Sequence, residues 1–299
     1  MRDFQEETAT DAVVARLAEC RDERLKQVMA AAARHLHDFV REVRPTTAEW
    51  LAAIDFLTRT GRKCTDTRQE WVLFSDIMGV SSLVDVVNNP TDDRVTESTV
   101  LGPFHVAGSP TLPHGANICR DGRGRPCVVS GRVLDADGAP VAGAVLDVWQ
   151  TTEDGWYDVQ QPGLQPEGNL RGKFATDATG HFWFVTVKPA SYPIPNDGPV
   201  GALLREMGRH PYRPAHIHFI ISAAGFASKT THIFAEGDPY LDSDAVFGVK
   251  STLIEVFHEV ADAEAAACHG VTAPFWKVSH DFHLGRDATV ATASEAVRA

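Results

Sequence analysis

The sequence has few cysteines, no excess of positive charge and no long apolar run. Its five cysteines are odd in number and share no Cys-x-x-Cys spacing, so we expect neither a disulfide framework nor a zinc ribbon. Only 28 lysines and arginines stand against 40 aspartates and glutamates, a formal net charge of −12. This balance excludes a general electrostatic attraction to nucleic acid or to an anionic membrane. Without a run of about 18 uncharged apolar residues, a membrane-spanning helix is excluded as well.

The first ten residues carry Asp3, Glu6 and Glu7 where a secretory signal needs basic residues followed by an apolar stretch. We therefore expect a cytoplasmic protein. Apolar residues make up 43% of the chain and charged residues 23%, which is typical of a soluble globular protein. A length of 299 residues suggests about two domains.

The first third of the chain has the apolar period of helices. Apolar residues recur at steps of three and four from Val13 to Phe39. Thr46 and Glu49 then have the spacing of a capping box, and Thr67 and Glu70 repeat it. The pattern predicts at least three amphipathic helices within residues 1 to about 90.

After residue 90 the helical period disappears and turn-forming residues separate short apolar runs. These runs predict strands over residues 127–134, 144–149, 182–187, 216–222, 230–234, 253–260 and 276–284, with another at Phe174. Many short strands without long helices between them indicate a β-sandwich or barrel. We expect the Ala-, Thr- and Ser-rich tail from residue 287 to be mobile.

His216 and His218 lie two residues apart in a predicted strand. Their side chains therefore project from one face, with Cα atoms about 7 Å apart, within reach of one metal ion. The spacing equally suits a half-buried strand with a polar face. No P-loop, H-E-x-x-H, G-x-S-x-G or dinucleotide-binding motif occurs. Chemistry in this chain would therefore involve the histidine pair, tyrosines and Arg213.

Four segments carry a resemblance to a known family: residues 146–150 (LDVWQ), 155–157 (GWY), 191–195 (SYPIP) and 213–218 (RPAHIH). They resemble the ligand segments of the intradiol ring-cleaving dioxygenases, and the similarity extends in order along nearly all of residues 1–285. The resemblance implies a mainly β protein.

Its expected parts are an N-terminal helical dimerisation domain, residues 1–100, and a catalytic domain, residues 101–299. The catalytic domain would be a transthyretin-like β-sandwich of two sheets, with its tail over residues 287–299 mobile.

The resemblance implies that Tyr157, Tyr192, His216 and His218 hold a non-haem ferric ion, Fe(3+). A charge count agrees, because Fe(3+) with two tyrosinates and one hydroxide is neutral, and a buried site tolerates neutrality. A free tyrosine has a pKa of about 10, so a phenolate at neutral pH needs a strongly acidic cation beside it.

Two residues are expected to take part in the reaction itself. By resemblance, Tyr192 leaves the metal and takes a substrate proton, whereas Tyr157 stays. Arg213 is expected to act as a fixed cation beside the ring carbon that accumulates negative charge. Substrate and O2 would react to give a muconate.

Within the family, residues 97–104 and 192–199 resemble those of the hydroxyquinol 1,2-dioxygenases. These enzymes open benzene-1,2,4-triol to 3-hydroxy-cis,cis-muconate, whose keto tautomer is maleylacetate. The same carry-over places Asp76 where it can accept a hydrogen bond from the third hydroxyl of the triol. His232 stands where catechol-cleaving relatives commonly carry glutamine. The implied substrate pocket is lined by Leu73, Asp76, Val100, Leu101, Gly102, Pro103, Phe104, Ile194, Pro195 and Arg213.

Three other functions are open at this point. The nearest is a catechol or chlorocatechol 1,2-dioxygenase, and a different class is a non-enzymatic transthyretin-like binding module. A zinc hydrolase lacks a carboxylate or cysteine in the right place. The apolar residues of the N-terminal helices predict a homodimer through them, and the resemblance leaves open a lipid at that interface. Neither nucleic acid nor membrane is expected as a partner.

Overall fold

The computed structural model describes residues 3–65, 68–89 and 92–287. Its contacts divide the chain into two compact units, Met1–Arg62 and Lys63–Ala299. The predicted domain boundary after residue 100 stays a prediction. Of the tail predicted to be mobile, residues 288–299 lie outside the described residues. No helix among the described residues is long and apolar enough to cross a membrane.

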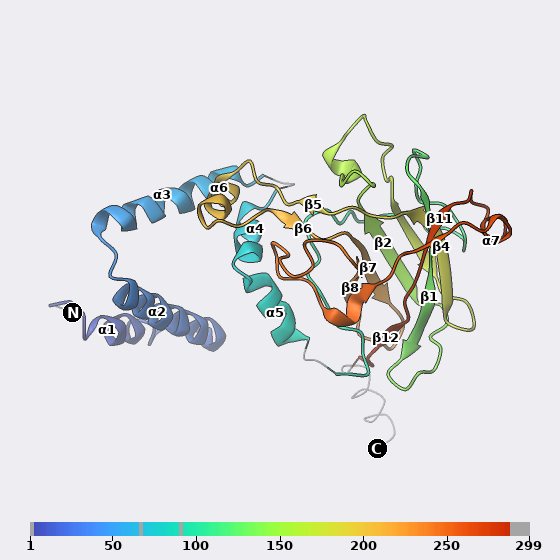
Figure 1. Ribbon diagram of the computed structural model, residues 1–299. Helices are drawn as coiled ribbons and strands as arrows, with labels where there is room; N and C mark the ends of the chain where they lie inside the picture. Colours follow the sequence, from blue (N-terminus) through green and yellow to red (C-terminus); the bar gives the residue numbers. More distant parts are fainter. Residues whose placement is uncertain (1–2, 66–67, 90–91, 288–299) are drawn as a thin grey trace, which may run out of the picture. The chain divides into compact units, whose positions relative to one another are not determined.

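Helices make up the regular structure of the first unit, in agreement with its apolar period (Figure 1). The capping box at the start of α3 is confirmed. The Glu49 carboxylate accepts a hydrogen bond from the Thr46 backbone at 2.8 Å, and Thr46 Oγ1 accepts one from the Glu49 backbone at 3.2 Å. The helices are α1 (Ala9–Ala15), α2 (Glu23–Val43) and α3 (Thr47–Lys63).

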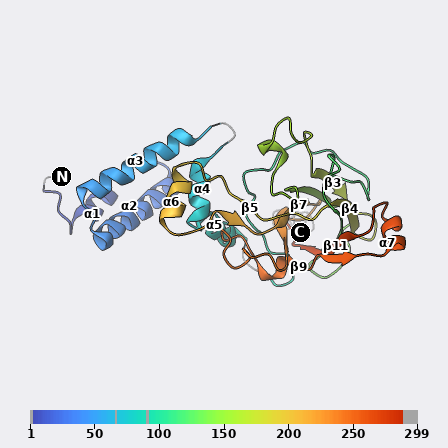
Figure 2. The ribbon, with the colours of Figure 1, turned by 45° about the horizontal axis from the view of Figure 1, so that its top comes forward.

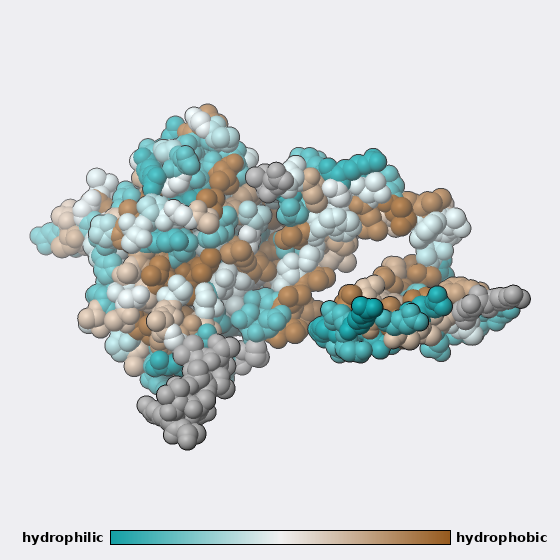
Figure 3. All heavy atoms as spheres, turned by 180° about the vertical axis from the view of Figure 1, so that it is seen from behind, coloured by the Kyte–Doolittle hydropathy of each residue, from teal (hydrophilic) through white to brown (hydrophobic). Residues whose placement is uncertain are grey.

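The apolar pattern from Val13 to Phe39 is divided between two helices rather than forming one. Helix α1 ends at Ala15, and α2 begins only after Asp22. The Asp22 side chain accepts a hydrogen bond from the Leu25 backbone N–H at 2.9 Å and caps α2. Figure 3 shows brown, apolar surface on these helices. The large apolar side chains exposed on α2 and α3 are Leu25, Val28, Met29, Leu36, Phe39, Val40, Val43, Trp50, Leu51, Ile54 and Leu57.

The second unit includes helices α4 (Glu70–Ile77), α5 (Val80–Asn88) and α6 (Pro199–Glu206). Figures 1 and 2 both show α6 beside α4. Glu70 connects them: its buried carboxylate pairs with Arg68 at 2.8 Å and accepts the Val200 backbone N–H at 3.3 Å. The capping role predicted for Thr67 falls outside the described residues.

The second unit also contains two five-stranded sheets. In the first sheet β1 is central: it pairs antiparallel with β4 and parallel with β11 and β12. This sheet contains β1 (Pro126–Asp135), β4 (His181–Val187), β10 (His258–Val260), β11 (Phe275–Ser279) and β12 (Phe282–Leu284). Helix α7 (Ala263–Cys268) lies between β10 and β11 in the chain.

The second sheet has the order β3-β2-β7-β8-β9, so that β7 is its middle strand. Its strands are β2 (Val145–Gln150), β3 (Arg171–Ala175), β7 (His216–Ser222), β8 (Lys229–Ala235) and β9 (Ile254–Glu255). A short separate pair joins β5 (Tyr192–Pro193) to β6 (Tyr212–Arg213).

The hydrophobic core lies between the two sheets. Phe174 of β3 stacks on Phe184 of β4 with ring centroids 4.8 Å apart, and Phe219 of β7 meets Phe282 of β12 at 4.9 Å. All four rings are fully buried, and each burial contributes roughly 1.5–3 kcal/mol. The predicted class, a two-sheet β-sandwich preceded by helices, is confirmed.

Candidate active site

Strand β7 serves two surfaces at once. Ile217, Phe219 and Ile221 point into the core between the sheets. Because side chains alternate along a strand, His216 and His218 project from the other face. Both histidines are 1% exposed. The predicted common face of the histidine pair is thus present, and this face is buried.

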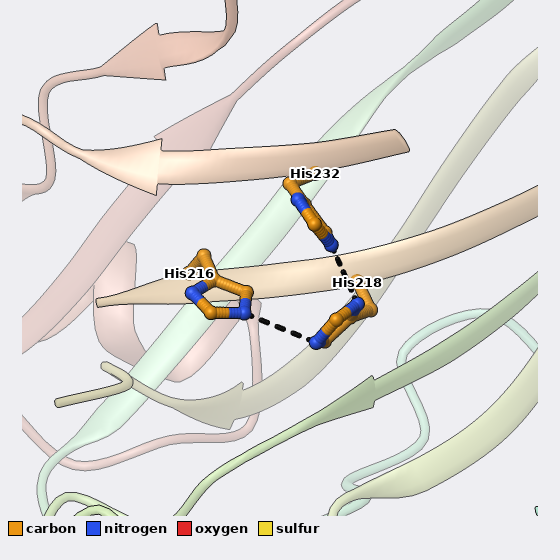
Figure 4. A group of neighbouring side chains, drawn as sticks. All are labelled: His216, His218 and His232. Carbon is orange, nitrogen blue, oxygen red and sulfur yellow. Dashed lines mark hydrogen bonds between the residues drawn. The ribbon is translucent and has the colours of Figure 1, made fainter. Parts of the chain in front are cut away.

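Two imidazoles and two phenols meet on that face. His216 Nε2 lies 3.0 Å from His218 Nε2, as Figure 4 shows, and His218 Nε2 lies 3.0 Å from Tyr157 Oη. The Tyr157 and Tyr192 hydroxyls are 3.5 Å apart. Strand β5 delivers Tyr192 beside Arg213, its register partner on β6. The structure therefore brings together all four residues predicted from the sequence as metal ligands.

The protonation of the histidines leaves nitrogen lone pairs in this cluster. His216 Nδ1 lies 2.6 Å from the Pro214 carbonyl oxygen, which only accepts, so Nδ1 carries the ring proton and Nε2 a lone pair. Burial, reinforced by Arg213, lowers the pKa of His216 to about 3. Burial and the neighbouring His232 hold the pKa of His218 well below its usual value. Both rings are therefore neutral donors to a cation.

The tyrosines are also suited to a cation. Burial, and then the neighbouring Tyr192, raise the pKa of Tyr157 well above its usual value. A phenolate here consequently requires a strong positive charge within bonding distance. This donor set fits a highly charged metal ion.

A second group of side chains in the described residues is also compact enough for a metal: His114, Asp177 and His181. It is partly exposed, and Asp177 Oδ1 already accepts three hydrogen bonds within its own turn. His114 Nε2 donates to the Ala175 carbonyl at 2.6 Å. This group therefore offers a weaker donor set than the buried cluster.

Arg213 is held by a carboxylate that sequence reasoning missed. Its Nη1 lies 3.3 Å from His216 Nε2, and its other nitrogens donate to Asp244 at 3.1 and 3.3 Å. Both side chains are 2% exposed. Burial would raise the pKa of Asp244, but the guanidinium and the Gly248 N–H bring it below its usual value. The pair is thus ionised and rigid.

Two adjoining cavities, of about 620 and 500 Å³, lie next to the cluster. Gln69, Val72, Asp76 and Pro103 line both of them. The larger cavity includes Val100, Leu101 and Gly102 of the predicted pocket, and the smaller includes Leu73, Phe104, Ile194 and Pro195. Nine of the ten residues predicted for the pocket thus line these cavities, and the tenth, Arg213, belongs to the cluster.

The cavity walls contact the cluster. Phe104 stacks on Tyr157 with ring centroids 4.5 Å apart. A Cβ at Gly102 would approach His218 Cε1 to 3.3 Å, and the φ of Gly102 is +73°, so glycine suits both the contact and the backbone. Asp76 is 8% exposed, and burial raises its pKa although Ser81 and Arg213 oppose the shift. A buried carboxylate therefore faces the cavities near Arg213.

The two tryptophans beside the cluster differ in burial. Trp149 is buried and stacks on His218 with ring centroids 4.5 Å apart. Trp156 is 43% exposed and lines the smaller cavity. Tyr212 and Tyr240, which are not in the ligand segments, stack on each other at 4.7 Å.

Comparison with known proteins agrees with this geometry. The family model described as "Dioxygenase" matches residues 101–285, and the one described as "Catechol dioxygenase N terminus" matches residues 22–96. The hydroxyquinol 1,2-dioxygenase of Rhizobium sp. (strain MTP-10005) is 56% identical over 284 residues, 95% of this chain and 96% of that protein. The 6-chlorohydroxyquinol 1,2-dioxygenase of Cupriavidus pinatubonensis is 52% identical, over 85% of this chain and 92% of that protein.

A solved structure agrees as well. The hydroxyquinol 1,2-dioxygenase from Pseudomonas putida DLL-E4 superposes with a TM-score of 0.88 at 45% identity, covering 94% of this chain and 99% of that one. The resemblance found in the sequence is confirmed over both helical and β regions. The chain belongs to the intradiol ring-cleavage dioxygenase family.

Proposed function

We propose that this enzyme opens benzene-1,2,4-triol with O2 between its two adjacent hydroxyl-bearing carbons, giving 3-hydroxy-cis,cis-muconate, whose keto tautomer is maleylacetate. The carrying observation is Asp76, a buried carboxylate in the wall shared by both cavities. It offers an acceptor to a third hydroxyl that catechol does not possess. Similarity to proteins named for hydroxyquinol cleavage supports the same substrate.

We propose Fe(3+) as the cofactor, held by Tyr157, Tyr192, His216 and His218. Support comes from the donor set: two neutral imidazoles and two buried phenols follow one another in the order His216, His218, Tyr157, Tyr192, each within 3.5 Å of the next. Phenolates need a more acidic cation than zinc, and ferric iron meets that need. When bound, the ferric ion supplies Lewis acidity and an electronic path between the ring and O2.

Tyr192 is the residue suited to move. It is the first residue of the two-residue strand β5, and residues 193–195 after it line the smaller cavity. Tyr157 is fixed more firmly, because Phe104 stacks on its ring and His218 lies 3.0 Å from its hydroxyl. We therefore assign Tyr192 as the base that takes one substrate hydroxyl proton and turns away as a neutral phenol.

Arg213 supplies a preorganised positive charge. Asp244 fixes the guanidinium, whose Nη1 lies 3.3 Å from His216 Nε2. A ring carbon that accumulates negative charge beside it is stabilised by about 2–4 kcal/mol, as found for single oxyanion donors. The buried surroundings preserve this effect because they exclude water.

Oxygen uptake with two substrates tests the assignment. The wild type is expected to turn over benzene-1,2,4-triol with a higher kcat/KM than catechol. Asp76→Ala removes the acceptor and is expected to lower that preference by about 10–100-fold, because a hydrogen bond to a charged group contributes roughly 1.5–3 kcal/mol. Asp55→Ala, on the exposed face of α3, is the matched control with an unchanged ratio. A wild-type preference for catechol, or an unaltered ratio in Asp76→Ala, would reject the proposal.

We also propose a homodimer formed through the N-terminal helices, with residues 1–100 as the dimerisation domain and 101–299 as the catalytic domain. The exposed apolar residues of α2 and α3 support it, since a water-soluble monomer rarely leaves so many together. Sedimentation of the purified enzyme tests the dimer. A monomer at micromolar concentration contradicts it, and mass spectrometry of an organic extract shows whether the interface also carries a lipid.

We propose a cytoplasmic location, and the cysteine thiols support it. Cys20, Cys119, Cys127 and Cys268 carry free thiols, as is usual in reducing compartments. Fractionation of cells is the test, and recovery of the enzyme from an extracytoplasmic fraction contradicts the location.

A further inference from the structure

A chain of hydrogen bonds continues from the cluster into the cavity wall. His218 Nδ1, on the far side of the ring from Tyr157, lies 2.6 Å from His232 Nε2 (Figure 4). His232 Nδ1 in turn lies 2.7 Å from Thr99 Oγ1. His232 is the register partner of His218 on β8 and is fully buried, and Thr99 is 4% exposed.

Neutral rings allow only two orders of the protons in this chain. In the first, His218 Nδ1–H donates to His232 Nε2, and His232 Nδ1–H donates to Thr99 Oγ1. In the second, the Thr99 hydroxyl donates to His232 Nδ1, and His232 Nε2–H donates to His218 Nδ1. The proton of His218 is then on its Nε2. Only the first order leaves a lone pair on His218 Nε2, the nitrogen that faces Tyr157.

His216 differs from His218 in this respect. The Pro214 carbonyl fixes the proton of His216, because an acceptor leaves one tautomer only. The tautomer of His218 depends instead on a partner that both donates and accepts. His232 is therefore the group that determines whether His218 is available as a ligand.

The His218 ring is packed between Trp149 and His232. Trp149 stacks on one face of the ring at an interplanar angle of 12°, and His232 meets it edge-on at 82°. Thr99 belongs to the segment that continues into Val100, and the Thr99 N–H donates to the Thr230 carbonyl at 3.0 Å. The hydrogen-bond chain thus connects His218 to the wall of the larger cavity.

We propose that His232 is a positioning residue that, with Thr99, holds His218 in the Nδ1–H tautomer and aims its Nε2 at the metal. The inference rests on the proposed iron centre. The terminal amide of a glutamine carries both an acceptor oxygen and a donor N–H₂. It therefore reproduces both hydrogen bonds, whereas leucine reproduces neither.

The experiment compares His232→Leu, His232→Gln and Thr99→Val as iron-loaded enzymes. The rate of iron loss to a chelator and the tyrosinate-to-iron absorption band are measured together with kcat and KM. His232→Leu is expected to lose iron about 10–100-fold faster, the usual cost of removing an outer partner of a ligand. His232→Gln should stay within about threefold of the wild type, and Thr99→Val should fall between the two.

Thr231→Val is the matched control. Thr231 is fully buried beside His232, but its hydroxyl donates to the Glu97 carbonyl at 2.8 Å, away from His218. Its iron loss and absorption band should match those of the wild type. Iron retention by His232→Leu equal to the wild type, or a loss in Thr231→Val equal to that in His232→Leu, would overturn the positioning role.

Two further outcomes are separable. A wild type that binds no iron and shows no tyrosinate band refutes the proposed centre itself. If His232→Leu does not fold, nitrogen-15 NMR of the metal-free wild type, in which no metal ion selects the tautomer of His218, decides the matter. A proton on His218 Nδ1 supports the proposal, and a proton on Nε2 overturns it.

Discussion

Substituting Asp244 by alanine should destabilise the β-sandwich strongly. Asp244 and Arg213 are both 2% exposed, and their two hydrogen bonds measure 3.1 and 3.3 Å. At an effective dielectric constant of about 20, unit charges about 3.1 Å apart attract each other by roughly 5 kcal/mol. Asp244→Ala leaves the guanidinium buried without its partner, so the free energy of unfolding should fall by about 3–5 kcal/mol.

Urea unfolding, followed by circular dichroism and tryptophan fluorescence, measures this loss. The double variant Arg213→Met, Asp244→Leu is the informative comparison, because it leaves no buried charge. It should be more stable than Asp244→Ala despite carrying two substitutions. An Asp244→Ala enzyme within 1 kcal/mol of the wild type, or a double variant less stable than the single one, would show that the pair is not electrostatically coupled as the distances imply.

Three other outcomes follow from the same geometry. Tyr157→Phe should lose iron and activity outright, whereas Tyr192→Phe should keep some iron, shift the visible band and slow substrate chelation; identical spectra in both would refute the separate roles. Removing iron with a chelator should abolish ring cleavage, and Fe(3+) but not Zn(2+) should restore it; activity with zinc would refute the ferric assignment. Hydrogen bonds from Lys63 and Arg68 lower the pKa of Asp197 to about 2. Because this pKa lies below that of an unfolded aspartate, about 3.9, the ionised Asp197 stabilises the folded protein above pH 3.9, and this stabilisation is lost as the pH falls toward 2. In urea unfolding, the free energy of unfolding of Asp197→Asn should therefore fall less between pH 5 and pH 2 than that of the wild type. An equal fall in the two proteins would contradict this role of Asp197.

Local chemistry made much of the fold predictable. The Thr46–Glu49 capping box depends on residues three apart, and it forms as the spacing predicts. The alternation of β7 likewise places His216 and His218 together on one face. Short apolar runs between turn residues predicted strands of both sheets, but the predicted strands 253–260 and 276–284 are each divided in two, into β9 and β10 and into β11 and β12.

Features that depend on tertiary contacts were not predictable from local patterns. Asp244 is 31 residues from Arg213, and a single aspartate in a polar loop has no signature of an ion pair. Thr99 reaches His232 across 133 residues of sequence. Helix α6 was missed because its eight residues sit among prolines and glycines, where the apolar period is too short to detect. The apolar pattern continues from α1 into α2, and only the capping residue Asp22 indicates that a new helix begins there.

One face of β7 packs in the hydrophobic core and the other carries the two histidines, and this has a consequence for how the active site forms. A shift of this strand by one residue would turn both imidazoles into the hydrophobic core and turn Phe219 toward the active site. His218 and Tyr157 are 61 residues apart in the chain, and the pairing of β2 with β7 brings the segments that carry them together. The proposed ferric site is therefore complete only when the sheet has paired, because its donors come from segments that the pairing brings together.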